Sequence, residues 1–394
     1  MYKTMEIRER INPTVLDIRP SGIRRFFNIV SEMKDVISLG IGEPDFVTPW
    51  HICDAGIYSL EKGITCYTAN AGLLELRREI CKYLERRFGL GYDPATQVVV
   101  TVGGSEAIDL AVRSLIRPGD EVIIPEPCFV CYDAIVRLAG GVPVPVPTDM
   151  EHDFALTPEA LEAVVTDKTR LVILSYPNNP TGAIMGRAEL EAVAEVIRRH
   201  DLMVISDEIY GELTYGSEGH VSVASLPDMY DRTVVVNGFS KTYAMTGWRM
   251  GYATGHPEII AAMTKIHQFA IMSAPTQSQY AAIEALKCGD ADIDRMRDEY
   301  DARRRLISEG LIAAGLSCYV PRGAFYVFPC IRSTGMTSEE FAEKLLHEKR
   351  VAVVPGDAFG ACGEGFVRLS YAASVENITE ALRRITEFVA EHKK

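Results

Sequence analysis

The segment that decides the fold is Gly238-Phe239-Ser240-Lys241-Thr242-Tyr243-Ala244-Met245-Thr246-Gly247-Trp248-Arg249-Met250-Gly251. It follows a predicted buried strand at 233–237 and places a lysine in a turn of small residues, with an arginine eight residues later. The Lys241 amine can form a Schiff base with an aldehyde, and the Arg249 guanidinium can bind a phosphate through two hydrogen bonds. A turn lysine is by itself usually a solvated surface residue, but this spacing favours an aldehyde cofactor that carries a phosphate.

Strands and helices alternate around this segment. Short apolar runs rich in β-branched residues predict strands at 97–102, 121–124, 171–175, 204–206, 233–237 and 250–254. Stretches with an apolar face at helical spacing predict helices at 105–116, 129–139 and 187–200. The alternation predicts an α/β fold whose mostly parallel sheet is flanked by helices on both faces.

The pattern changes near residue 285. A long, charge-rich helix is predicted at 292–315, followed by short strands at 323–328, 351–354 and 366–370 with helices between and after them. This order is typical of a smaller α+β unit. We therefore expect a large domain at 51–284 and a small domain made of 1–50 together with 285–394. No Gly/Ser-rich linker separates the two, so we expect them to pack closely.

Composition excludes several classes of protein. The 394 residues are 47% hydrophobic and 24% charged, which is ordinary for a globular chain and excludes a disordered or fibrous one. The net charge of −13 argues against nucleic acid or an anionic membrane as a partner. The charged N-terminus predicts no secretory signal, and no apolar run is long enough to predict a transmembrane helix. Since the nine cysteines are odd in number and scattered, we expect reduced thiols in a cytoplasmic protein.

Two further strand ends carry groups that suit the same ligand. In Gly103-Gly104-Ser105, between a predicted strand and helix, the glycines let the backbone approach a ligand and the helix N-terminus offers N–H groups to a phosphate. Asp207 follows the apolar strand at 204–206, and its carboxylate can pair with a protonated ring nitrogen that Tyr210 can also approach. Taken singly, each motif is more often a simple turn or a capping residue.

Two other segments are candidate binding elements. Pro177-Asn178-Asn179-Pro180 predicts a rigid turn after the strand at 171–175. Arg368 lies in an otherwise apolar strand, where its charge is costly unless paired, so either an anionic ligand or a structural salt bridge is expected. The motif Cys128-Phe129-Val130-Cys131 has no second cysteine pair and no nearby histidine, so we expect no metal site there.

In this order and spacing, these segments resemble the class I and II aminotransferases, which are fold-type-I enzymes that use pyridoxal 5′-phosphate. The resemblance runs from Ser38-Leu39-Gly40-Ile41-Gly42-Glu43-Pro44-Asp45-Phe46 to the strand of Arg368, and the lysine segment fits the family's cofactor-attachment signature. Within the family the chain is most similar to archaeal aromatic-amino-acid aminotransferases, through the segments 236–241 and 350–360. That subgroup also contains aspartate, alanine and kynurenine enzymes, and a C–S lyase on the same fold is a further alternative.

The resemblance implies a role for each candidate residue. Lys241 would hold the cofactor and move the substrate's Cα proton, while Asp207 would keep the pyridine nitrogen protonated. Tyr210 and Asn179 would hydrogen-bond the phenolic oxygen of the ring, and Phe129 would stack on its face. The implied phosphate ligands are Gly103, Gly104, Ser105 and Arg249. The implied ligands of the substrate α-carboxylate are Arg368 and the backbone at Gly42, and Asn179 is also an implied substrate-binding residue.

Three positions refine this expectation. Many relatives have a phosphate-binding serine three residues before the lysine, where this chain has Gly238, so Ser240 is a candidate replacement. Tyr67 matches a tyrosine that in the family reaches the phosphate of the neighbouring subunit, which implies a homodimer with shared active sites. Close aspartate enzymes keep a lysine where this chain has Ser105, so we expect an aromatic amino donor, with 2-oxoglutarate as the acceptor.

Overall fold

The computed structural model describes residues 7–18, 33 and 35–393. A seven-stranded sheet in the order β2-β8-β7-β6-β5-β3-β4 forms the centre of its larger part. Only β8 among these strands runs antiparallel to its neighbours, β2 and β7. The strands are β2 Val98–Thr101, β3 Glu121–Glu126, β4 Val142–Pro147, β5 Thr169–Ser175, β6 Met203–Asp207, β7 Thr233–Gly238 and β8 Gly251–Thr254.

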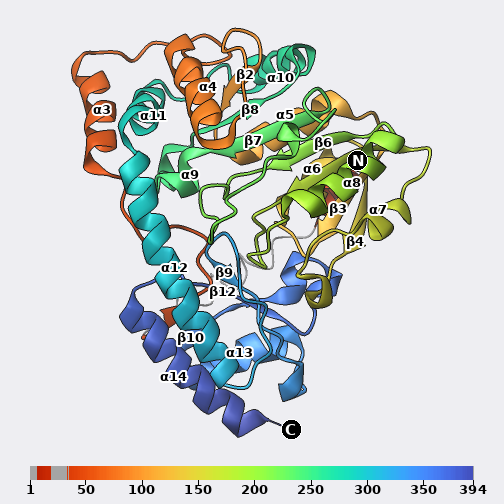
Figure 1. The fold of residues 1–394 in the computed structure, drawn as a ribbon, viewed down its shortest axis with the longest axis vertical. Helices are drawn as coiled ribbons and strands as arrows, with labels where there is room; N and C mark the ends of the chain where they lie inside the picture. Colours follow the sequence, from red (N-terminus) through yellow and green to blue (C-terminus); the bar gives the residue numbers. More distant parts are fainter. Residues whose placement is uncertain (1–6, 19–32, 34, 394) are drawn as a thin grey trace, which may run out of the picture.

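Helices cover both faces of this sheet (Figure 1). In β6, Val204 packs in one core cluster with α7 and α8, and the next residue, Ile205, packs in another with α5, α6 and α10. Because the strand is covered on both faces, its neighbouring residues Val204 and Ile205 are both apolar. The helices are α1 Pro13–Asp17, α3 Trp50–Glu61, α4 Leu74–Phe88, α5 Gly104–Leu115, α6 Cys131–Leu138, α7 Pro158–Glu162, α8 Arg187–Arg199, α9 Phe239–Thr242, α10 Pro257–Ala270 and α11 Thr276–Cys288.

The C-terminal part is built around a long helix. Figure 1 shows α12 running from the end of α11 down to the C-terminal elements, with α14 beside its lower half. β9, β11 and β12 form an antiparallel sheet in the order β11-β12-β9, and β1 pairs in parallel with β10. The elements are β1 Ile37–Ser38, α12 Asp290–Ala313, β9 Tyr326–Val327, α13 Ser338–Lys349, β10 Val351–Ala352, β11 Val354–Pro355, β12 Val367–Ser370 and α14 Val375–His392.

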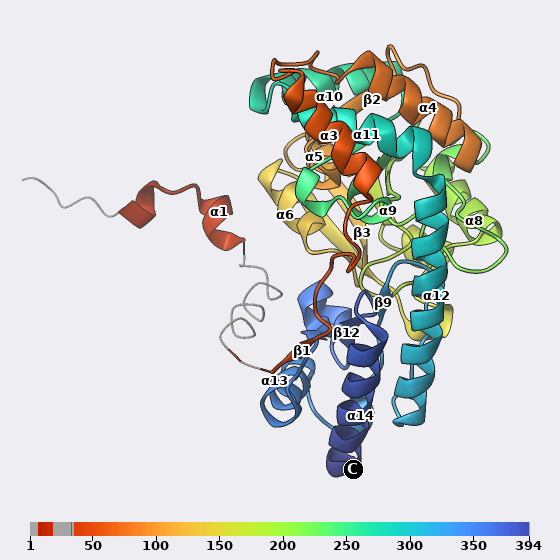
Figure 2. The ribbon, with the colours of Figure 1, turned by 90° about the vertical axis from the view of Figure 1, so that its left-hand side faces the viewer.

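The segment between β1 and α3 joins the two parts (Figure 2). Leu39 N donates to Ala352 O in the C-terminal part, and Thr48 Oγ1 donates to Ala244 O beside the lysine turn. Asp45 accepts two hydrogen bonds of 2.8 Å from Arg303 of α12. These contacts fix the backbone around Gly42 against both parts of the molecule.

The α/β fold with a mostly parallel, helix-flanked sheet is confirmed, but the strand β4 was not predicted. Its sequence, Val-Pro-Val-Pro-Val-Pro, lacks every second backbone N–H. The structure places it at the sheet edge, where only one side of a strand needs donors. Val142 N donates to Asp120 O, so the alternate positions occupied by proline direct their nitrogens away from β3.

Several predicted elements differ in extent, and the strand expected at 323–328 is reduced to β9 at Tyr326–Val327. The single strand expected at 351–354 divides into β10 and β11, because Val351 pairs with β1 and Val354 pairs with β12. The helix expected at 129–139 begins at Cys131, so Phe129 lies in the preceding turn. None of the nine cysteines, all of which are described, forms a disulfide. Across the described ranges, every helix is too short or too polar to cross a membrane.

Candidate active site

A cavity of about 500 Å³ opens at the carboxyl ends of β5, β6 and β7, against β12 of the C-terminal part. It brings together most of the residues predicted from the sequence: Gly42, Gly104, Ser105, Phe129, Asn179, Asp207, Tyr210, Ser240, Lys241, Arg249 and Arg368. Gly103 directly precedes Gly104 in the chain and lies beside the guanidinium of Arg249. Tyr67 does not line the cavity of its own chain, and its side chain is 82% exposed.

Lys241 lies in the short helix α9, which follows β7. Its Nζ donates a hydrogen bond of 2.6 Å to Gly42 O and lies 5.9 Å from the centre of the Tyr210 ring. Burial lowers the pKa of the Lys241 amine to about 8, although the charge of Glu43 acts in the opposite direction. A lowered pKa increases the fraction of neutral, nucleophilic amine near neutral pH.

Asp207 is the last residue of β6 and is buried. Its Oδ2 accepts a hydrogen bond of 2.7 Å from Tyr132 OH, and its Oδ1 accepts one of 3.2 Å from Ile209 N. Burial raises the pKa of the Asp207 carboxyl to about 6, and these two hydrogen bonds only partly oppose the shift. Within the described ranges no basic side chain pairs with Asp207, so the carboxylate suits a cationic group of a ligand.

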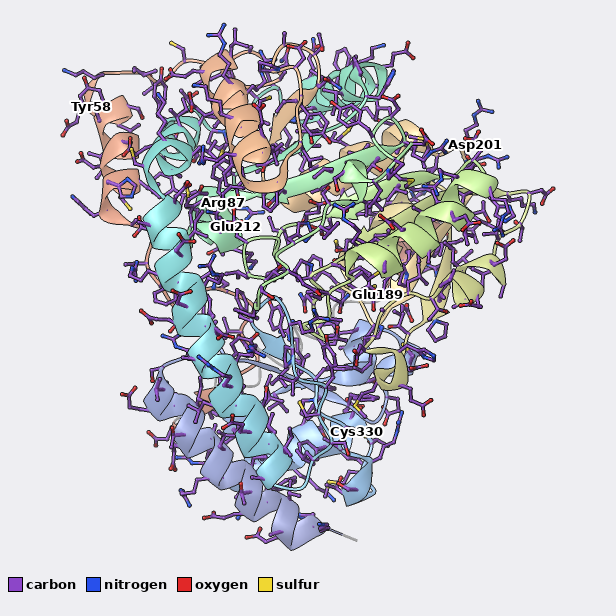
Figure 3. The ribbon with its side chains drawn as sticks, viewed as in Figure 1. Tyr58, Arg87, Glu189, Asp201, Glu212 and Cys330 are labelled. Carbon is purple, nitrogen blue, oxygen red and sulfur yellow. The ribbon has the colours of Figure 1, made fainter. Side chains whose placement is uncertain are left out.

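Glu208 and Glu212, which follow Asp207 in the chain, fix the position of its backbone through contacts outside the cavity. Glu208 accepts from Ser222 Oγ at 2.7 Å and lies 2.9 Å from His220 Nε2. Figure 3 shows Arg87 and Glu212 side by side, and two hydrogen bonds of 2.9 and 2.6 Å join them. Since 208 and 212 are anchored away from the cavity, Asp207 is presented toward it on a rigid backbone.

Arg249 faces the turn between β2 and α5. Its Nη1 donates to Thr246 O at 2.9 Å, and no carboxylate in the described part of the chain forms an ion pair with it. Gly103 has a φ of +81°, and a Cβ at this position would lie 2.5 Å from Arg249 Nη2. Only glycine therefore allows the guanidinium to approach the turn, where the N-terminus of α5 presents its free N–H groups. The two features together suit a phosphate.

The structure explains why residue 238 is glycine. A Cβ at Gly238 would lie 2.9 Å from Met250 O and 3.1 Å from the Gly251 Cα, because β7 and β8 pair closely at this point. A serine at this position would push the two strands apart. Ser240 lines the cavity instead, so that a hydroxyl-bearing residue is still present there.

Arg368 of β12 is buried, with an exposed fraction of 2%. Its Nη1 donates to Asn179 Oδ1 at 2.9 Å and its Nη2 to Gly40 O at 2.6 Å, while its Nε has no partner in the described residues. The rings of Tyr326 and Phe359 lie 4.5 and 4.8 Å from its Cζ. All these partners are neutral, so Arg368 forms no salt bridge with the described residues, and of the two expectations the anionic ligand is the one that its buried charge favours.

Several lining residues were not singled out in the sequence. Tyr132 donates to Asp207, and Tyr326 OH lies 2.9 Å from Tyr210 OH. Both are single tyrosines in apolar stretches, where a core position is the ordinary interpretation. The position of Tyr132 three residues after Phe129 was an available signal, since Phe129 lies in the turn before α6 and Tyr132 in the first turn of that helix. Further lining residues are Glu43, Ile108, Ser175, Ile209, Thr246 and Gly247.

The set of side chains fits pyridoxal phosphate. The Lys241 amine suits its aldehyde, the Asp207 carboxylate suits a protonated ring nitrogen, and the cradle formed by Gly103 and Arg249 suits its phosphate. Arg368 remains available for the carboxylate of a second molecule in the same cavity.

The raised pKa of Asp207 predicts a pH-dependent stability of the ligand-free protein. Because its folded-state pKa of about 6 exceeds the ordinary 3.8, the wild-type carboxyl stabilises the fold at low pH, and this contribution is lost as the pH rises through 6. The shift corresponds to about 3 kcal/mol. Relative to Asp207→Asn, the free energy of unfolding of the wild type should fall by up to this amount between pH 4 and 7, measured by urea denaturation. A pH-independent difference would contradict the raised pKa.

Comparisons with known proteins agree with this geometry. The family described as "Aminotransferase class I and II" matches residues 34–385. An aspartate aminotransferase of Pyrococcus abyssi is 46% identical, and an aromatic-amino-acid aminotransferase of Thermococcus litoralis is 43% identical, each over 95% of this chain and 97% of its own length. The crystal structure of an aromatic aminotransferase from Pyrococcus horikoshii, 46% identical, has a TM-score of 0.89 over 93% of this chain and 99% of that one. This chain belongs to the class I and II aminotransferases, pyridoxal-phosphate-dependent enzymes of fold type I.

Proposed function

We propose that this aminotransferase moves the amino group of an aromatic amino acid to 2-oxoglutarate, and that Lys241 binds the cofactor covalently. The observation that carries the proposal is the Lys241 amine, which shares one cavity with the Asp207 carboxylate and the unpaired Arg368 guanidinium. When bound, the cofactor supplies an aldehyde for the amino group and a ring that accepts electrons from the substrate Cα. The residues of the chain bind the two substrates and move the proton.

The Lys241 amine is proposed to take the proton from the substrate Cα, and it would return this proton to C4′, the carbon that carries the aldehyde in the free cofactor. A pKa of about 8 suits this role, because the amine can both accept and donate a proton near neutral pH. Arg368 and the backbone at Gly42 are proposed to hold the α-carboxylate, which fixes the Cα. Gly42 O already lies within hydrogen-bond distance of Lys241 Nζ, so the carboxylate site and the base adjoin.

The remaining roles follow the donors in the cavity. Asp207 is proposed to pair with the ring nitrogen, which would give its buried carboxylate the cation that it lacks. Tyr210 and Asn179 are proposed ligands of the ring oxygen, and Phe129 is proposed to stack on the ring. The proposed phosphate ligands are Gly103, Gly104, Ser105, Ser240 and Arg249.

Lys241→Ala tests the central assignment. The variant should retain the fold and lose transamination, while pyridoxal phosphate still binds without a covalent bond. In the wild type, borohydride reduction should attach the cofactor to the peptide that contains Lys241, identified by mass spectrometry. Lys82→Ala, which changes an exposed lysine of α4, is the matched control and should keep both activity and labelling. Full transamination by Lys241→Ala would refute the assignment.

The choice of donor depends on the charges in the cavity. Lys241, Arg249 and Arg368 are the basic residues among the described lining residues, and each has a proposed role apart from the donor side chain. Ser105 lines the cavity where close aspartate enzymes keep a lysine, and Phe129 and Tyr326 add aromatic surface. An aromatic donor would need no further cation. Aspartate, alanine or kynurenine transamination and C–S lyase activity are the alternatives, and several relatives are named as aspartate aminotransferases.

A panel of amino donors with 2-oxoglutarate distinguishes these activities. Phenylalanine or tyrosine should exceed aspartate in kcat/KM by about tenfold, or about 1.4 kcal/mol of transition-state binding. Ser105→Lys should shift the ratio toward aspartate, because it adds a cation for the distal carboxylate. The aromatic assignment fails if the wild type prefers aspartate by the same margin, and release of pyruvate without an acceptor would indicate a lyase.

We propose that the enzyme is a homodimer with shared active sites. Tyr67 is 82% exposed although its loop is held in place, with Cys66 O accepting from Thr276 and Asn70 Nδ2 donating to Met272 O. Three other large apolar side chains are also strongly exposed: Val47 87%, Trp50 72% and Phe269 83%. A second copy of the chain would cover them and bring Tyr67 to the partner's phosphate site.

Mixed dimers test the shared site. Tyr67→Ala and Arg249→Ala should each inactivate the enzyme alone. If the two residues of one site come from different chains, each hybrid has one site with both lesions and one intact site. Mixing equal amounts should then restore about one quarter of wild-type activity, since half of the dimers are hybrids. Subunit exchange is verified by mass spectrometry; no recovery after verified exchange would place Tyr67 in its own subunit's site.

The expected domain division, 51–284 against 1–50 with 285–394, is retained as a proposal. The pairing of β1 with β10 supports it, because this pairing attaches the N-terminal segment to the C-terminal part. Residues 1–6, 19–32 and 34 of that segment lie outside the described residues. A cytoplasmic location is likewise proposed, and the nine unpaired cysteines support it.

A further inference from the structure

Behind the proposed phosphate site lies a buried acid–histidine pair that none of the roles above uses. Glu106 is the third residue of α5, and His267 lies in the last turn of α10. His267 Nδ1 and Glu106 Oε1 are 2.7 Å apart, with side-chain exposures of 0% and 13%. Neither residue is among those that line the cavity.

Both carboxylate oxygens of Glu106 are engaged away from the first turn of α5. Oε2 accepts from Val102 N, which precedes the helix, and Oε1 meets His267. Within the described ranges, the N–H groups of Gly104 and Ser105 have no acceptor, as is usual for the first residues of a helix. These are the groups that the proposed function assigns to the cofactor phosphate.

A histidine at position 267 carries a free-energy cost, which its hydrogen bond to Glu106 must offset. His267 Nε2 is buried and has no partner among the described residues, whereas an apolar side chain would fill the same place without an unsatisfied nitrogen. Its backbone is fixed, because His267 O accepts from both Ile271 N and Met272 N. What the imidazole adds to this core is the hydrogen bond to Glu106.

We infer that His267 is a positioning residue, which holds the Glu106 carboxylate so that it does not compete with the cofactor phosphate. A carboxylate in the first turn of a helix is attracted to the same free N–H groups as a phosphate, and its charge repels the phosphate. The hydrogen bond from His267 keeps this carboxylate on the far side of the turn. The inference rests on the proposed phosphate site at Gly103, Gly104, Ser105 and Arg249.

The test compares pyridoxal phosphate with pyridoxal, which lacks the phosphate, as ligands of the cofactor-stripped protein. His267→Leu should raise the Kd for pyridoxal phosphate about tenfold, equivalent to about 1.4 kcal/mol, and leave the Kd for pyridoxal unchanged. Adding Glu106→Ala to this variant should restore most of the affinity, because the released carboxylate is gone. His267→Asn keeps a donor near the position of Nδ1 and should bind nearly as the wild type does.

Met263→Ala is the matched control for packing. Met263 lies one turn earlier on α10 and is fully buried in the core cluster that contains Ala107 and Ile108 of α5. Truncating it should therefore lower Tm without changing the ratio of the two Kd values. Should His267→Leu fail to fold, His267→Ala replaces it in both the single and the double variant. Equal loss of affinity for both ligands, or a double variant weaker than His267→Leu, overturns the inference. A wild type that binds both ligands equally refutes the phosphate site itself, and the inference with it.

Discussion

The buried guanidinium of Arg368 connects the parts of this molecule that form the site. It extends from β12 of the C-terminal part to Asn179, which follows β5 of the large sheet, and to Gly40 of the segment that leads into α3. A charge at 2% exposure with only neutral partners is unfavourable by itself. The fold supports this cost because these segments are held by other contacts: by the sheet, by the pairing of β1 with β10, and by the hydrogen bonds that Asp45 accepts from Arg303 of α12. Their convergence places an arginine without an anionic partner in the described residues at the point where sequence-distant segments meet.

Burial in the cavity shifts the pKa values of Lys241 and Asp207 in opposite directions. It lowers the pKa of Lys241 and raises that of Asp207, so in each case the neutral form becomes more accessible. For the lysine, neutrality is the reactive state. For the aspartate, a cationic ligand nitrogen would restore the charge, and Tyr132 holds the carboxylate in place to meet it. A single physical cause, the burial of both groups in one cavity, thus makes the amine of Lys241 easier to deprotonate and leaves the Asp207 carboxylate in need of a cationic partner.

The sequence predicted the elements whose signals are local. The strand before Lys241, the Gly103-Gly104 turn and the polar residue at the end of β6 were all visible, because strand ends in a parallel sheet meet at one edge. The edge strand β4 was missed because its prolines argue against a strand unless its edge position is known. Tyr132 and Tyr326 were missed because their functional contacts are made across the fold. The glycine at 238 was noted as a departure from relatives, but its cause, the approach of Gly251, is a tertiary constraint.

The question of the donor is one of charge balance within this cavity. Arg249 and Arg368 already contribute to lowering the pKa of the Lys241 amine, as does its burial. A fourth cation near Ser105 would lower that pKa further and would itself need a permanent anion when no dicarboxylate is bound. An apolar donor side chain makes no such demand and gains from the aromatic walls. The proposed acceptor, 2-oxoglutarate, would still have to place its second carboxylate in this cavity, whose lining includes the hydroxyl-bearing residues Ser105 and Thr246. The arrangement of charges therefore favours a donor without a charged side chain.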